Sequence, residues 1–400
     1  MLKKEIEDIL AERIVDRMQE ANELILKQIG DAVRQISMLT PSQAYQLAQI
    51  LKYGGSYEKI AYELARVSGK NIQEIYKIFE EVAKSNKQFA KEFYRYRGID
   101  YIPYKKDSAL QMQVNALASL TADRYRNITS TIGIGFLTEN LDGQIMFKNI
   151  KQTYDEVIDR SILAISQGKA TFQQEMRRVL NTIGHSGLVL YDSGRTRRLD
   201  SAIRMNILDG IRMVNETTTK IYGEEYGADG VEISVHPAPA PDHADIQGRQ
   251  FRNEEYEKLE NGQKAKDVKG VEYDGSQKRH IAELNCYHKT FNIIVGVSKP
   301  EYSDKELKEI QEENKKGFDY EGKHYSLYEG TQLQRRLETS VRKEKDTQIL
   351  ARASGFDDMA RDSQARINIL TSKYNELTII SGLRPQKQRM SVSGYRKIKV

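Results

Sequence analysis

A helical repeat of apolar residues over positions 6–36 constrains the fold more than any other feature of the chain. Apolar side chains recur there at spacings of three and four, and most intervening positions carry charges or amides. This spacing places the apolar residues on one stripe of a long α-helix. Such a helix is stable when other apolar surface packs against its stripe and buries it. The pattern therefore predicts either helices that fold back on one another or a surface that docks on a partner.

Three further helix starts follow within the first hundred residues. Thr40-Pro-Ser-Gln43 has the pattern of a capping box, with the proline at the first helical position. Ser56 and Asn71 each precede a helical apolar pattern and are expected to cap two separate helices. Residues 1–100 are therefore predicted to form a helical N-terminal docking region, whose deletion should leave the remainder folded.

Residues 101–230 are predicted to form a helical middle domain. Apolar spacing indicates helices over 110–125 and 150–166, and Thr131-Ile-Gly-Ile-Gly135 is interpreted as a flexible joint between them. The strongest helix of this region begins at Leu199, where apolar residues step in fours and threes.

The segment that leads into this strongest helix, Asp192–Asp200, is rich in arginine. Cations at a helix N-terminus oppose the helix dipole, which costs a few tenths of a kcal/mol for each exposed charge. Carboxylates or phosphates of a partner would remove that cost, and a solvated Arg/Asp network within the helix is the alternative. The candidate contacts for nucleic acid or an acidic partner are Arg195, Arg197 and Arg198.

The pattern changes after Gly230. Short alternating segments at 231–235 and 245–251 predict strands, and three of the seven prolines lie between 236 and 243. Residues 231–300 are therefore predicted to form a small α+β block, followed by a helical C-terminal region over 301–382. The predicted fold class is mainly α with a small α+β insert.

The basic excess of the chain is confined to its last 18 residues. The net charge is +5, and residues 383–400 carry six cations and no carboxylate, which leaves −1 for the remainder. This basic tail is interpreted either as a solvated, mobile terminus or as an arm for nucleic acid or an acidic partner. Its cations are Arg384, Lys387, Arg389, Arg396, Lys397 and Lys399.

One group of residues has side chains suited to metal chemistry: His236, His243, Cys286 and His288. Side chains two residues apart in an extended segment share a face, so Cys286 and His288 point the same way. Four such ligands could hold a tetrahedral zinc ion in a closed structural site. The alternative is that the histidines are ordinary polar loop residues and the cysteine a small buried apolar one.

Other sequence signals exclude several classes of protein. Cys286 is the only cysteine, which excludes an intrachain disulfide. No run approaches the ~18 apolar residues of a membrane span, and the start of the chain lacks a signal-peptide core, so a cytosol-like compartment is expected. No P-loop, Gly-x-Ser-x-Gly or dinucleotide fingerprint occurs, and we expect no enzyme. A metal-dependent hydrolase or nuclease built on the His/Cys group remains the alternative.

Four ordered motifs resemble the phage minor capsid proteins of tailed phages and prophages of Gram-positive bacteria, of the minor capsid 2 type. They are related more distantly to the Mu F-like head morphogenesis proteins. The motifs are the segments 193–204, 236–248, 285–288 and 296–307. Members often carry another cysteine shortly before the Asn-Cys-x-His unit, and this chain has Ala282 near that place.

The resemblance implies a structural virion component made in the bacterial host cytoplasm. It implies a place in the head near the portal, with the portal protein and other capsid components as partners and several copies per particle. Packaged DNA is a further candidate partner, and no membrane is involved in assembly. In this setting the predicted role of residues 1–100 is docking to the portal or to neighbouring copies.

Overall fold

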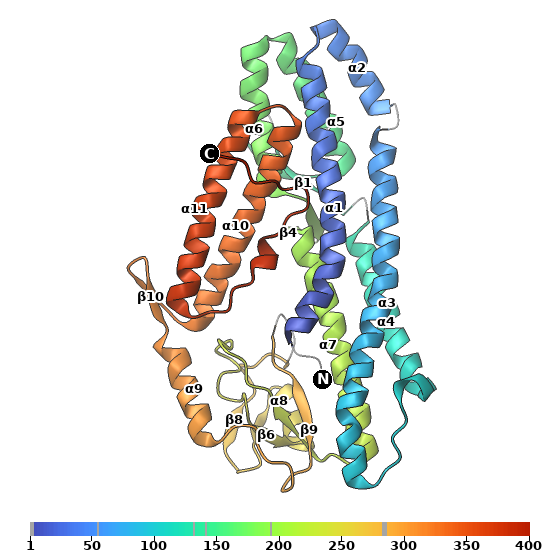
Figure 1. Cartoon of the computed structure of the whole chain (residues 1–400), viewed down its shortest axis with the longest axis vertical. Coiled ribbons are helices and arrows are strands. Elements are labelled where there is room, and N and C mark those ends of the chain that lie inside the picture. Colours follow the sequence, from blue (N-terminus) through green and yellow to red (C-terminus); the bar gives the residue numbers. More distant parts are fainter. Residues whose placement is uncertain (1–3, 54–55, 131–132, 141, 193, 282–285) are drawn as a thin grey trace.

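The computed structural model is an elongated helical body with a small α/β block at one end (Figure 1). It describes residues 4–53, 56–130, 133–140, 142–192, 194–281 and 286–400. The predicted fold class, mainly α with a small α+β insert, is confirmed. The helices are α1 (Lys4–Ser37), α2 (Pro41–Tyr53), α3 (Ser56–Arg97), η1 (Tyr104–Lys106), α4 (Ser108–Ile128), α5 (Ile150–Ser166), α6 (Lys169–Ser186), α7 (Leu199–Tyr226), α8 (Asn253–Glu260), α9 (Asp304–Lys316), α10 (Leu327–Ala353), α11 (Asp357–Ser381) and η2 (Lys387–Met390).

The strands form small antiparallel sheets. The sheet orders are β2-β1-β3-β4 in the helical body and β6-β5-β9 in the α/β block, with hairpins β7-β8 and β10-β11. The strands are β1 (Ile134–Glu139), β2 (Ile145–Asn149), β3 (Val189–Asp192), β4 (Arg195–Arg198), β5 (Gly230–Ile233), β6 (Gln250–Arg252), β7 (Lys264–Lys266), β8 (Glu272–Asp274), β9 (Thr290–Ile293), β10 (Phe318–Tyr320) and β11 (Lys323–Tyr325).

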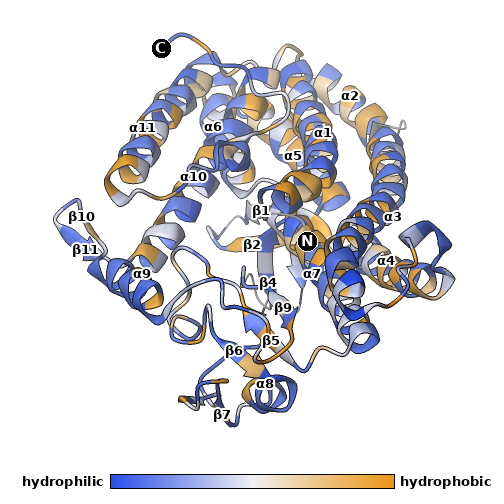
Figure 2. Ribbon diagram, turned by 60° about the horizontal axis from the view of Figure 1, so that its bottom comes forward, coloured by the Kyte–Doolittle hydropathy of each residue, from blue (hydrophilic) through white to orange (hydrophobic). Residues whose placement is uncertain are grey.

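The apolar stripe of α1 lies at the centre of the helical body. Ile14, Ile25 and Ile29 on this stripe are fully buried, and α1 contacts α3, α7 and α10. Figure 2 shows hydrophobic and hydrophilic residues alternating along these helices, as expected when each helix buries one side. The chain thus covers the stripe itself, which contradicts the expectation that residues 1–100 can be removed without unfolding the remainder.

Residues 56–97 form one helix, α3, in place of the two that the sequence predicted. Asn71 is buried within it, and its side-chain amide donates to the carbonyl oxygen of Ile14 at 3.1 Å and to the hydroxyl of Tyr125 at 2.8 Å. This asparagine therefore joins α3 to α1 and α4 and does not cap a helix. The predicted Ser56 cap lies outside the described side chains.

The predicted joint at 131–135 is partly a strand. Residues 131 and 132 lie outside the described residues, and β1 begins at Ile134. Gly135 pairs with Asn149 of β2. A Cβ atom at position 135 would lie 1.9 Å from the carbonyl oxygen of Lys148. The glycine is therefore required for close strand pairing, which is a different role from the predicted flexibility.

The α/β block has an apolar core of its own. β5 pairs with both β6 and β9, and α8 covers β5 and β6. The strand predicted over 245–251 is wrong for most of its length, because residues 241–248 form turns and β6 begins at Gln250. The core residues are Val231, Ile233, Ile246, Phe251, Leu259, Ala265, Tyr273 and Ile281.

The tail, residues 383–400, is packed against the helical body. Val392 is part of the main core. The hydroxyl of Ser393 donates to the Glu23 carboxylate of α1 at 2.6 Å, and the backbone amide of Ile398 donates to the Gln364 side chain of α11 at 3.1 Å. The interpretation of this segment as a mobile terminus is therefore wrong. Apolar residues between the cations anchor it.

Candidate functional site

Strand pairing in the α/β block brings three of the four predicted metal ligands together. Ile233, at the end of β5, pairs with Thr290, at the start of β9. The chain before β9 therefore runs beside the chain that follows β5. His243 lies in the turns after β5, and Cys286 and His288 lie just before β9. Their ligand atoms all lie within 4.8 Å of one another.

Hydrogen bonds orient the rings of this His/Cys cluster. Nδ1 of His243 and Nδ1 of His288 both lie 3.2 Å from Sγ of Cys286. Nε2 of His243 lies 2.8 Å from the carbonyl oxygen of Arg279, which can only accept, so Nε2 carries the hydrogen. His243 and His288 are both buried. Burial, together with the imidazoles of His236 and His243, lowers the pKa of His288 to about 3, so its ring is neutral near pH 7.

His236 lies beside the cluster and is not one of its three members. Its ring stacks on Tyr287 with centroids 5.1 Å apart and lies 5.9 Å from the ring of His288. Tyr287 accepts hydrogen bonds from Arg335 of α10 at 3.1 Å and from Arg389 of the tail at 3.3 Å. The cluster is therefore coupled to the helical body through Tyr287.

The carboxylates that flank His243 in sequence, Asp242 and Asp245, are held in ion pairs. Asp242 accepts two hydrogen bonds from the Arg279 guanidinium, at 2.7 and 3.0 Å, and Asp245 accepts one from Lys278 at 2.6 Å. Burial by itself would raise the pKa of Asp242, but the Arg279 hydrogen bonds outweigh it and lower that pKa to about 2. Each carboxylate is therefore charge-compensated by a neighbouring cation.

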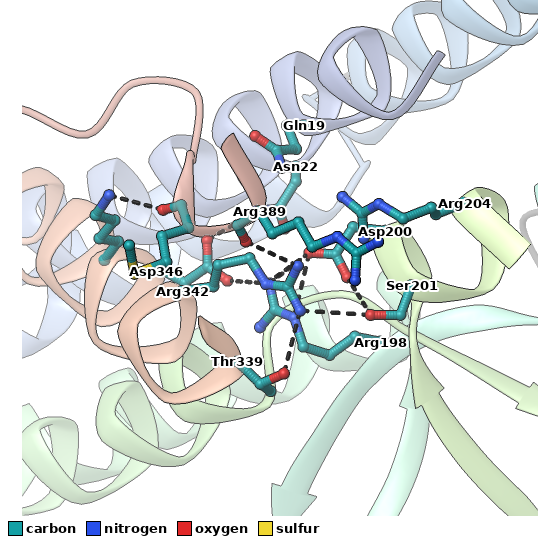
Figure 3. A network of polar contacts seen from close by, with 12 residues as sticks. Gln19, Asn22, Arg198, Asp200, Ser201, Arg204, Thr339, Arg342, Asp346 and Arg389 are labelled. Carbon is teal, nitrogen blue, oxygen red and sulfur yellow. Dashed lines mark hydrogen bonds and ion pairs between the residues drawn. The ribbon is translucent and has the colours of Figure 1, made fainter. Parts of the chain in front are cut away.

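The arginine-rich segment before α7 divides into exposed and buried members. Arg195 and Arg197 are exposed on β4. Arg198 is directed inward, and its Nη2 lies 3.2 Å from the Asp200 carboxylate and 2.8 Å from the Asp346 carboxylate of α10 (Figure 3). Chain carboxylates therefore compensate the cation nearest the helix N-terminus, so an external acidic partner is not needed for that residue.

The carboxylates around Arg198 belong to a wider buried ionic network that joins α1, α7 and α10. Arg204 forms two hydrogen bonds with Glu12, at 2.7 and 2.8 Å, and the Asn22 amide donates to Asp346 at 3.0 Å. Burial would raise the pKa of Asp200, but the surrounding arginines outweigh burial and hold that pKa well below its usual range. At Asp346 burial dominates and raises the pKa.

The sequence analysis missed these carboxylate partners. Asp346 lies 148 residues from Arg198, and Glu12 lies 192 residues from Arg204. In the sequence, Asp346 and Glu12 are each only a carboxylate within a predicted helix. Without the packing of that helix, nothing shows which cation the carboxylate contacts. Only the packing of α1, α7 and α10 identifies these partners.

The tail cations also divide into two groups. Arg389 is buried, and its guanidinium lies 3.7 Å from the Asp8 carboxylate, while Arg384 donates to Glu5 at 2.5 Å. Both therefore face carboxylates of α1. Arg384 is nevertheless exposed, and so are the other four tail cations, Lys387, Arg396, Lys397 and Lys399.

A cleft of about 1050 Å³ lies between the first turns of α1, the α/β block and the start of the tail. Its lining includes Ile9 and Phe89, which are 55% and 48% exposed. Large apolar side chains that face a cleft of this size are typical of an interaction surface. Phe291 of β9 and Leu383 of the tail extend the apolar lining.

Comparison with known proteins identifies the class of the chain. A family model described as phage minor capsid protein 2 matches residues 3–378, nearly the whole length. The class is thus that of bacteriophage capsid proteins. The chain belongs to the phage minor capsid protein 2 family, which confirms the resemblance seen in its motifs. No curated protein and no solved structure gave a significant match.

The family places the chain among virion proteins that associate with other capsid components. Among the helices that the structure describes, none combines the length and apolarity needed to cross a bilayer.

Proposed function

We propose that this protein is a structural component of the phage head that binds at the portal vertex and acts in head assembly. Membership of the minor capsid family supports the virion role. The observation that carries the portal proposal is the apolar cleft at the junction of α1 and the α/β block. A structural role is favoured over hydrolysis because Asp242 and Asp245, the carboxylates that flank His243 in sequence, are held in ion pairs.

The proposed occupant of the cleft is an apolar segment of a portal subunit. Ile9 projects from the solvent side of α1, whose opposite side is fully buried in the body. Packing against the helical body therefore holds α1 in place, and the side chain of Ile9 stays exposed for contact with a partner. Burying an exposed side chain of this size contributes about 1.5–3 kcal/mol, so a few such residues would support a specific contact. This proposal keeps residues 1–100 in the docking surface, through Ile9 and Phe89, and adds residues of the α/β block and the tail.

The test is incorporation of Ile9→Arg chains into particles. Mature particles would be purified, and the amount of this protein and its cross-linking to the portal subunit would be measured. We expect Ile9→Arg to reduce both strongly, because it replaces an apolar contact with a charged side chain whose removal from water is unfavourable.

Leu163→Arg is the matched control. Leu163 on α5 is also 55% exposed, and it does not line the cleft. This variant should be incorporated normally, and circular dichroism should show both variants folded. Normal incorporation and unchanged portal cross-linking of Ile9→Arg would contradict the proposal.

A further inference from the structure

With both imidazoles neutral, the His/Cys cluster contains a hydrogen-bonding conflict that the single thiol hydrogen does not resolve. In the neutral ring of His243, Nε2 donates to the Arg279 carbonyl and Nδ1 directs a lone pair at the sulfur of Cys286. The orientation of His288 is fixed in the same way. The backbone N–H of His236 donates to Oε1 of Gln247 at 3.0 Å, so this atom is the amide oxygen, and it lies 3.3 Å from Nε2 of His288.

Nε2 of His288 therefore donates to Gln247, and its Nδ1 also presents a lone pair to the sulfur, at 3.2 Å. The Cys286 thiol has one hydrogen and can donate to only one of the two rings. The second lone pair then faces sulfur without a hydrogen between them, in a site where both histidines are buried. A metal cation bound by Nδ1 of His243, Sγ of Cys286 and Nδ1 of His288 would accept a lone pair from each of these three atoms.

We propose that His243, Cys286 and His288 bind a zinc ion through Nδ1, Sγ and Nδ1. Two imidazole nitrogens and one thiolate form a ligand set that zinc prefers. Zinc bond lengths of about 2.1 Å to nitrogen and 2.3 Å to sulfur place tetrahedral N and S ligands about 3.6 Å apart. The observed N···S distances of 3.2 Å are close to this value. Binding releases the thiol proton to solvent.

The surroundings of the three ligands match a metal centre. The hydrogen bonds to the Arg279 carbonyl and the Gln247 amide are the outer contacts by which proteins orient metal-binding imidazoles. A cavity of about 80 Å³ borders all three ligands. This space admits a water molecule as the fourth ligand. His236 is not required, which changes the ligand set expected from sequence.

The ion would connect two segments of a block with a small core. His243 belongs to the turns after β5, and Cys286 and His288 precede β9. Among the described residues of this block, eight buried apolar side chains form the core. Small cores gain much of their stability from metal ions or cross-links. Because Tyr287 contacts α10 and the tail, the ion would also hold the block against the body.

The test measures zinc in the full chain by elemental analysis and by competition with a chelator. We expect one zinc per chain, and in the cobalt-substituted protein a near-ultraviolet thiolate-to-metal band. Cys286→Ser should abolish the band and weaken zinc binding by more than about 100-fold. Gln247→Leu should weaken it by about 10-fold, because outer contacts contribute 10- to 100-fold.

Two further histidine variants serve as controls. His280→Ala removes an exposed histidine of the same block, bound to Glu260, and His236→Ala removes the neighbour of the cluster. Both should keep one zinc per chain. The cobalt band is measured on the unaltered chain, so the test holds even where a variant fails to fold. A wild-type chain without stoichiometric zinc and without the band, or a folded Cys286→Ser chain that keeps zinc, overturns the site.

Discussion

Nη2 of Arg198 lies 2.8 Å from Oδ2 of Asp346, although 148 residues separate them in the chain. Arg198 precedes the first residue of α7, and Asp346 is fully buried within α10. The pair therefore joins two helices beside the central helix α1, whose Asn22 also bonds Asp346. A buried pair of this kind fixes how the helices are arranged, because either charge alone is unfavourable in the interior.

Replacing Asp346 with alanine should destabilise the chain by about 3–5 kcal/mol, because it leaves the buried Arg198 without one of its carboxylates. Denaturant unfolding gives the free energy. The double variant Arg198→Met/Asp346→Leu should recover part of the loss. As a control, Asp358→Ala removes an exposed ion pair with Arg177 and should cost less than about 1 kcal/mol. Equal effects at the two aspartates would contradict the proposed role of the network.

Gly135→Ala should destabilise the sheet of the helical body. The added Cβ would meet the Lys148 backbone, which cannot yield without separating β1 from β2, and overpacking of this kind costs about 1–3 kcal/mol. Gly69→Ala is the matched control: no atom lies within 4 Å of its Cβ position in helix α3. That change should stabilise the chain by about 0.5–1 kcal/mol. Thermal unfolding of both variants tests the pair.

Stability should rise with pH through a half-buried lysine of α10. Burial lowers the pKa of Lys345 from 10.5 to about 8, while its Nζ donates to the Met390 carbonyl at 2.7 Å. Between these two values the unfolded chain holds a proton that the folded chain has released, so the free energy of unfolding increases with pH. Lys345→Met should remove this increase between about pH 8 and 9.5. Parallel pH profiles for the two proteins would contradict the assignment.

DNA binding by the tail stays a prediction, and the fold changes how it is tested. Truncation at Gly382 would remove Val392 from the main core, so it would confound binding with stability. Changing the exposed cations Lys387, Arg396, Lys397 and Lys399 to glutamine avoids this. Affinity for duplex DNA should fall, and the log–log salt slope should decrease by about 0.9 for each phosphate that the variant no longer neutralises.

The comparison variant for DNA binding is Arg195→Gln/Arg197→Gln, on exposed β4. An unchanged salt slope in the tail variant together with a smaller slope in the β4 variant would move the DNA-binding surface to β4. Unchanged slopes in both would contradict DNA binding through either group of cations.

The sequence by itself determined most helices and the class of protein. Residues 150–166 form a helix with the predicted bounds, and the capping box at Thr40 is present, with the Thr40 amide 3.2 Å from Oε1 of Gln43. The family followed from short ordered motifs. These features depend on periodicity and on contacts a few residues apart, which a single sequence records directly.

Only the tertiary structure decided what each surface and polar group contacts. Asn71 resembled a helix cap because its local pattern suits one, yet Tyr125, 54 residues away, binds its amide. His236 matched the other ligands in type, but the β5–β9 register placed it outside the His/Cys cluster. The apolar stripe of α1 indicated burial without showing whether this chain or another covers it. Hydrophobic burial is not directional, and buried charges accept any partner of suitable geometry, so the packing of distant helices selects the contacts.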